Sequence, residues 1–176
     1  RDLDALENQS MPDAIVSSNH VELGALRYGQ VKTCTVTLTN IGYVMTQFRF
    51  VAKPGDVVTM PPWLMVAPAA GIIVPGEAVD LVFTAQVDYR SAGPLNRGEM
   101  VVDDIAVLHL ENGKDLFISI TGEWQKSFIG GSLQELVGVD GGPEPDHVPR
   151  QLWAMVDHLN TFGLGDPNLF LDSGSS

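Results

Sequence analysis

The sequence has 176 residues, of which 44% are hydrophobic and 18% are charged, and its 22 acidic and 10 basic side chains give a net charge of −12. This composition suits a folded globular domain and excludes a chain that is disordered throughout. The negative charge repels phosphate groups, which argues against nucleic acid and against direct membrane binding. No apolar run reaches the roughly 18 residues that a membrane-spanning helix requires. The single cysteine, Cys34, allows no internal disulfide bond and favours a reducing compartment.

Residues 1–15 are predicted to form a short N-terminal helix followed by a linker. Leu3 and Leu6 lie at helical spacing, and Pro12 ends the helical pattern.

From about His20 the apolar residues alternate with a period of two, which is typical of β-strands. Turn signals such as Pro75-Gly76 separate the strand-like runs, and residues 91–97 are expected to form a loop rich in Gly and Pro. About seven short strands with almost no helix predict an all-β fold, an immunoglobulin-like β-sandwich of two sheets over residues 16–137.

The composition changes again at residues 138–148, where Gly and Pro predict a linker. Residues 149–176 begin with a helical pattern in which Leu152, Val156 and Leu159 form one stripe. So short a segment cannot build a core of its own. We interpret it as the first helix of a truncated domain, or as a helix that packs back on the sandwich.

No group of residues predicts catalysis, a cofactor or a metal site. The histidines lie in separate segments without metal-ligand spacing, and Asp103-Asp104 is interpreted as a solvated acidic pair. We therefore predict that this chain is a non-catalytic binding module and not an enzyme.

The dipeptide Asn112-Gly113 is the strongest hairpin signal in the chain. A two-residue turn would pair Glu111 with Lys114, and opposed residues share a face of the sheet. One face would then have core composition: Ile105, Val107, His109, Leu116, Ile118 and Ile120. The other face would carry Ala106, Leu108, Leu110, Phe117 and Ser119.

This second face is too apolar to lie in water. Either the helix with Leu3 and Leu6 covers it, or it is a docking surface. A three-residue bulged turn would shift the register and change both faces.

Several motifs together resemble the ASH domains (ASPM–SPD-2–Hydin), which are related to major sperm protein. They are Leu38-Thr39-Asn40-Ile41-Gly42, Phe48-Arg49-Phe50, Pro62-Trp63-Leu64 and Ile73-Val74-Pro75-Gly76-Glu77. The stretch 103–122 is similar to the ASH domain of the OCRL / type II inositol polyphosphate 5-phosphatase family.

This resemblance implies a domain order and a function. A phosphoinositide 5-phosphatase domain would precede the chain, and residues 149–176 would open a catalytically inactive RhoGAP-like domain. The family's ASH domain binds Rab small GTPases in the GTP form. The chain would then be cytoplasmic and be recruited through its partner to endosomal or Golgi membranes or to the cilium. The alternative is a structural or ciliary/centrosomal scaffold without Rab binding.

The resemblance also assigns the partner-binding residues to the N-terminal helix and the late hairpin. They are Leu3, Leu6, Gly113, Lys114, Leu116, Phe117 and Ser119.

Overall fold

The computed structural model describes residues 11–132, 150–163 and 165. The chain divides into two compact units, Arg1–Gly130 and Gly131–Ser176. The predicted N-terminal helix with Leu3 and Leu6, and the predicted linker over 138–148, lie outside the described residues.

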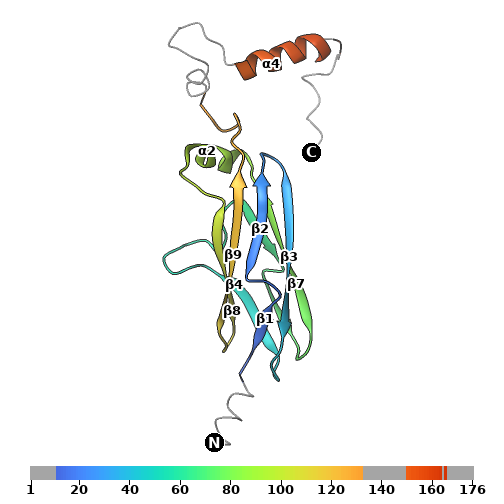
Figure 1. The fold of residues 1–176 in the computed structure, drawn as a ribbon, viewed down its shortest axis with the longest axis vertical. Helices are drawn as coiled ribbons and strands as arrows, with labels where there is room; N and C mark the ends of the chain where they lie inside the picture. The colour runs from blue at the N-terminus through green and yellow to red at the C-terminus, as the bar shows by residue number, and fades with distance from the viewer. Residues whose placement is uncertain (1–10, 133–149, 164, 166–176) are drawn as a thin grey trace, which may run out of the picture. The chain divides into compact units, whose positions relative to one another are not determined.

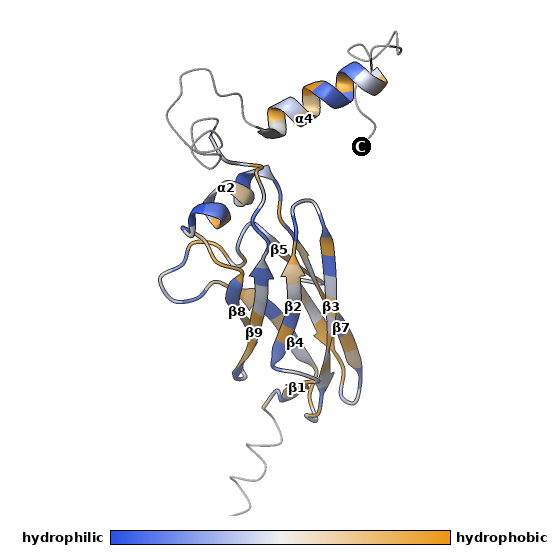
Figure 2. Cartoon of the chain, turned by 45° about the horizontal axis from the view of Figure 1, so that its top comes forward, coloured by the Kyte–Doolittle hydropathy of each residue, from blue (hydrophilic) through white to orange (hydrophobic). Residues whose placement is uncertain are grey.

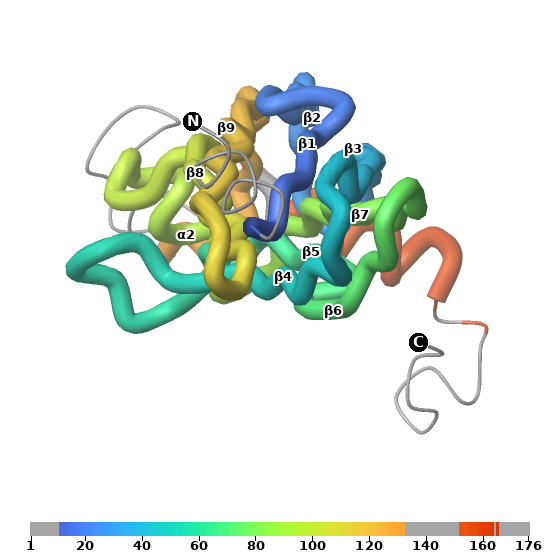
Figure 3. The backbone as a smooth tube through the Cα atoms, turned by 90° about the horizontal axis from the view of Figure 1, so that it is seen from below, coloured from blue at the N-terminus to red at the C-terminus, as the bar shows by residue number. Residues whose placement is uncertain are grey.

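Nine strands form within residues 11–132 and make two sheets that lie face to face (Figures 1 and 3). The four-stranded sheet has the order β1-β3-β7-β5 and the five-stranded sheet the order β2-β9-β8-β4-β6. The strands are β1 (Ala14–Val16), β2 (His20–Leu26), β3 (Val31–Asn40), β4 (Thr46–Val51), β5 (Leu64–Ala67), β6 (Ala70–Ile73), β7 (Ala78–Gln86), β8 (Asp103–Leu110) and β9 (Asp115–Trp124). The predicted immunoglobulin-like sandwich is confirmed, with nine strands instead of about seven.

Alternation along each strand separates the core from the surface. In β4, Phe48 and Phe50 are buried while Gln47 and Arg49 are exposed, and the hydropathy colouring of Figure 2 shows the same mixture along other strands. The ring of Phe50 meets that of Phe83, from the opposite sheet, edge to face at 5.9 Å between centroids. Aromatic and aliphatic side chains of both sheets thus form one core between the layers.

The loop predicted at residues 91–97 is wrong, because helix α2 (Tyr89–Arg97) occupies this segment. The carboxylate of Asp88 caps the helix by accepting hydrogen bonds from the backbone N–H groups of Arg90 and Ser91, at 3.0 and 3.2 Å. At the other end Gly98 adopts a left-handed conformation with φ of 74°. These two caps outweigh the helix-breaking tendency of the Gly93-Pro94 pair that suggested a loop.

The side chain of Asn96 fastens α2 to the segment that follows β9. Its amide nitrogen donates to the carbonyls of Ser127 and Ile129, at 2.7 and 3.0 Å. Its amide oxygen accepts from the indole of Trp124 at 2.9 Å and from the backbone N–H of Ser127 at 3.2 Å. One side chain therefore satisfies four polar groups where the sandwich ends.

The register predicted for the late hairpin is wrong by one residue. The ladder pairs Val107 with Phe117 and His109 with Asp115, and the backbone N–H of Leu110 bonds the carbonyl of Lys114. The loop thus has three residues, and Asn112 adopts a positive φ of 57°. Glu111 is the first residue of this loop. Its N–H donates a hydrogen bond to the carbonyl of Gln47 in β4, which holds Glu111 against the sheet.

This shift exchanges the two faces of β8 while those of β9 stay as predicted. Ile105, Val107 and His109, which were predicted to be in the core, lie on the outer face. The residues of β8 in the core are Ala106, Leu108 and Leu110.

Asp104 is not solvated, although the sequence predicted a solvated acidic pair at Asp103-Asp104. Its side chain is only 5% exposed and forms an ion pair with Lys53, whose side chain is 35% exposed. This hydrogen bond with Asp104 raises the pKa of Lys53 above its ordinary range. The ion pair joins the loop that follows β4, which projects from the sandwich in Figures 1 and 3, to the start of β8.

Replacing Lys53 with Met should lower the free energy of unfolding by about 1–3 kcal/mol at neutral pH, because it leaves a nearly buried carboxylate without its counter-charge. The partial exposure of Lys53 keeps the loss below that of a fully buried pair. Urea denaturation measures the loss, and Lys126→Met, at an exposed lysine, is the matched control.

The stability that Lys53 contributes should decrease as the pH rises. Because the folded-state pKa of Lys53 is raised, the contribution of the pair is complete below the ordinary lysine pKa. It is lost as the pH rises through the raised value, so wild type and Lys53→Met should converge in strong alkali. A difference that persists unchanged there would contradict this origin of the stability.

Candidate partner-binding site

The outer surface of the β8–β9 hairpin carries an exposed apolar patch. Phe117 is 58% exposed, and Val107, which is itself only 5% exposed, lies directly opposite it in the ladder. Ile105, also exposed, faces Ser119 two positions further along. We call Ile105, Val107, Phe117 and Ser119 the hairpin face.

The edge of β9 beside Phe117 is open. The neighbouring strand β2 begins at His20, which pairs with Ser119, so within residues 11–132 no strand pairs with Asp115–Ile118 on that side. The N–H of Ser119 points to this side, where it bonds the carbonyl of Asn19 at 2.9 Å. Because alternate residues of a strand point the same way, the N–H of Phe117 also faces the open edge. The exposed ring of Phe117 thus lies beside a strand edge that has unpaired main-chain groups.

The N-terminal part of the described chain runs beside the hairpin turn. The ammonium of Lys114 lies 2.7 Å from a carboxylate oxygen of Asp13. A Cβ added at Gly113 would stand 3.1 Å from the carbonyl oxygen of Pro12, so the turn and this segment are in close contact. Pro12 and Asp13, near the start of the described chain, therefore lie next to the hairpin turn.

The predicted site residues differ in their exposure and in the face of the hairpin on which they lie. Phe117 is exposed and Ser119 half-buried on the hairpin face, and Lys114 is exposed beside the turn. Leu116 points to the other face of β9, where it packs against the core, so it is placed to support the strand and not to contact a partner. Leu3 and Leu6 lie outside the described residues.

Ile105, which is exposed, and Val107, which is only 5% exposed, were both assigned to the wrong face of β8. Their outward position follows from the one-residue register shift alone, and no local feature of the sequence reveals it. The three-residue turn, which remained an open alternative for the hairpin, gives the correct faces.

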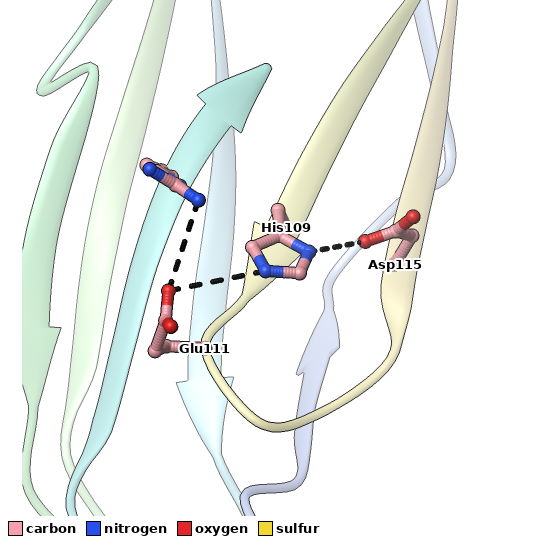
Figure 4. A network of polar contacts seen from close by, with 4 residues as sticks. His109, Glu111 and Asp115 are labelled. Carbon is pink, nitrogen blue, oxygen red and sulfur yellow. Dashed lines mark hydrogen bonds and ion pairs between the residues drawn. The ribbon is translucent and has the colours of Figure 1, made fainter. Parts of the chain in front are cut away.

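A polar network flanks the hairpin face toward the turn (Figure 4). The Nδ1 atom of His109 lies 2.7 Å from Asp115, and its Nε2 atom lies 3.9 Å from Glu111. Arg49 of β4 approaches the same Glu111 oxygen at 3.9 Å. These contacts tie β4, β8 and β9 together and place two carboxylates next to the apolar patch.

The described residues contain neither a metal-binding group nor a membrane-spanning helix. Among those residues, no group of three His, Cys, Asp or Glu side chains is placed to hold a metal ion. Within the same ranges, no helix is long and apolar enough to cross a membrane.

Comparison with known proteins gives matches over most of the chain. Residues 16–124 match the family described as inositol polyphosphate 5-phosphatase OCRL-like, ASH domain. The chain is 28% identical over 200 residues to the type II inositol 1,4,5-trisphosphate 5-phosphatase of Mus musculus, covering 99% of this chain and 20% of that protein. The chain thus spans one fifth of the length of this relative.

Similar solved structures are distant in sequence. The ASH / PapD-like domain of human CEP192 is 11% identical with a TM-score of 0.47, covering 65% of this chain and 86% of that chain. SSP-19, an MSP-domain protein like family member from Caenorhabditis elegans, is 13% identical with a TM-score of 0.42, covering 61% of this chain and 96% of that chain.

Proposed function

Because the chain belongs to the family of OCRL-like ASH domains of inositol polyphosphate 5-phosphatases, we propose that it binds Rab small GTPases in the GTP form through the hairpin face. It is a non-catalytic module, and its binding recruits the phosphatase of the parent protein to endosomal or Golgi membranes or to the cilium. The predicted RhoGAP-like domain that begins near residue 149 is part of the same proposal.

The observation that carries this proposal is the exposure of Phe117 beside an open strand edge. An aromatic ring that is 58% exposed in the free domain can be buried on binding, and such rings are common anchors at the centres of interfaces. Ile105 extends the apolar patch, and the carboxylates of Glu111 and Asp115 favour a partner with basic groups beside its own apolar patch.

GTP dependence follows from the way small GTPases change shape. Their switch segments are ordered by the γ-phosphate and released after hydrolysis. A binding module that contacts an ordered switch therefore loses its partner surface when GDP replaces GTP.

A pull-down with a panel of purified Rab proteins tests the proposal. Each Rab is loaded either with a non-hydrolysable GTP analogue or with GDP. We expect at least one Rab to bind the 176-residue chain in the GTP-analogue form and not in the GDP form. Failure of every Rab to bind in either form would reject Rab binding and favour the scaffold function.

A further inference from the structure

Strand β6 forms one edge of the five-stranded sheet, and its outer main-chain groups are open. Within residues 11–132 it pairs with β4 alone. The carbonyl of Ala69 faces β4, because it accepts a hydrogen bond from the N–H of Phe50 at 2.9 Å. Since main-chain groups alternate along a strand, those of Ala70 and Ile72 point to the open side. No other main-chain group of the described residues bonds them there.

The surface beside this edge is apolar. Five large side chains there are exposed, and we call them the β6 edge patch: Ile41, Tyr43, Met45, Ile72 and Val74. Met45 and Ile72 line one pocket of about 180 Å³. The amide nitrogen of Asn40 holds the loop before β4 to the end of β6, because it donates to the carbonyls of Val44 and Ile73, each at 2.9 Å. The patch is therefore built from neighbouring segments at one end of β6.

This part of the chain is also free of charge. Residues 57–76, which include all of β6, contain no acidic, basic or histidine residue, although the net charge of the chain is −12. Residues 33–48, which hold the rest of the patch, contain none either. Edge strands of soluble proteins usually carry a charged residue or a proline that prevents pairing with another strand, and Ala70–Ile73 has neither.

A second copy of the same chain fits this uncharged edge. A two-fold axis at Gly71 would place Ala70 of one copy opposite Ile72 of the other, so that the two residues exchange hydrogen bonds through their open main-chain groups. Each large Ile72 side chain then lies opposite a small alanine. At the open edge of β9, by contrast, self-pairing would bring Asp115 of both copies to the junction, which the negative charge of the chain opposes.

We propose that two copies of this chain associate through β6, which joins their five-stranded sheets into one continuous sheet. Because β6 has only four residues, the interface belongs to the small class that buries less than about 1,200 Å² in total. We expect a weak dimer, with a Kd on the order of 100 μM. Strand β4 separates β6 from β8, and the patch shares no residue with the hairpin face, so the dimer does not depend on Rab binding.

Sedimentation-velocity ultracentrifugation of the 176-residue chain tests the proposal between about 10 μM and about 1 mM protein. We expect a monomer at the lowest concentration and mostly dimer at the highest. Both copies are strongly negative, so salt should strengthen the dimer by screening their repulsion. Raising NaCl from about 0.05 M to about 0.5 M should lower the Kd about threefold or more.

Two variants test the β6 edge, and two serve as controls. Ala70→Pro removes an N–H that points to the open side and leaves the bonds to β4 in place, so it should abolish the dimer. Ile72→Glu puts a carboxylate on each paired strand and should also abolish it. Met65→Glu is the matched control, because Met65 is exposed to nearly the same degree on β5, an edge strand of the other sheet. Met65→Glu and Phe117→Ala should dimerise as wild type does.

The proposal is overturned if the chain stays monomeric at about 1 mM in about 0.5 M NaCl. It is equally overturned if Ala70→Pro or Ile72→Glu is folded by circular dichroism and dimerises as tightly as wild type, or if Met65→Glu weakens the dimer as much as they do. If one of the two β6 variants fails to fold, the other decides. None of these results affects the pull-down with Rab proteins, because that experiment depends on the hairpin face.

Discussion

Phe117→Ala is expected to weaken binding of the GTP-loaded Rab by about 30-fold or more, because loss of a central aromatic anchor typically costs about 2 kcal/mol or more. Thermal unfolding should change little, since the ring is 58% exposed in the free domain and its removal leaves no cavity. Isothermal titration calorimetry gives the affinity, and thermal unfolding followed by circular dichroism gives the stability. Phe117→Val should behave in the same way.

Tyr89→Ala is the matched control for this experiment. Tyr89 is an exposed aromatic residue on α2, at the opposite end of the sandwich from the hairpin turn (Figure 1). Its replacement should leave Rab affinity unchanged. If Phe117→Ala stays folded and binds as well as wild type, the hairpin face is not the interface. If it unfolds, the ring is a core residue and the outward placement is wrong.

Trp63→Ala is expected to lower the free energy of unfolding by about 3–5 kcal/mol, the usual loss when a buried Trp leaves a cavity. Trp63 is 1% exposed and is among the largest fully buried side chains of the described chain. A loss of this size should lower the melting temperature by more than about 10 °C.

The exposed Trp153 of helix α4 (Arg150–His158) provides the control, because Trp153→Ala removes the same side chain without creating a cavity in the sandwich. A melting temperature for Trp63→Ala equal to that of Trp153→Ala would contradict the burial of Trp63.

The sequence predicted the sandwich well because its main signals are local. Alternating apolar residues and turns fixed the positions of most strands, for example β3 and β4. Two elements were missed for physical reasons. Strand β1 has only three residues, too few to show alternation. Helix α2 contains Gly93-Pro94, and its stability depends on the caps at Asp88 and Gly98 and on the Asn96 contacts, which join distant parts of the chain.

The candidate site was predicted in part. Alternation within β9 was enough to place Phe117 outward and Ile118 inward. Predicting which residues of β8 face outward also requires the length of the turn. That length depends on the hydrogen bond that the N–H of Glu111 donates to the carbonyl of Gln47 in β4. A bond between residues so far apart in sequence cannot be read from the Asn112-Gly113 dipeptide alone.

The same limit explains why the Lys53–Asp104 pair was not predicted. It joins a loop to a strand, and no spacing marks it in the sequence. Composition and periodicity describe which segments pair, whereas this ion pair depends on how the paired segments pack.

Hydrogen–deuterium exchange with and without a GTP-loaded Rab tests the central claim most directly, because it reports on the main chain of every segment at once. Binding at the hairpin face predicts strong protection of residues 114–119, which include the open edge of β9 at residues 115–118, and little change in β5 or β7. GDP-loaded Rab should give no protection. Protection confined to the four-stranded sheet or to the segment after residue 130, with residues 114–119 unchanged, would contradict the hairpin face as the Rab-binding site.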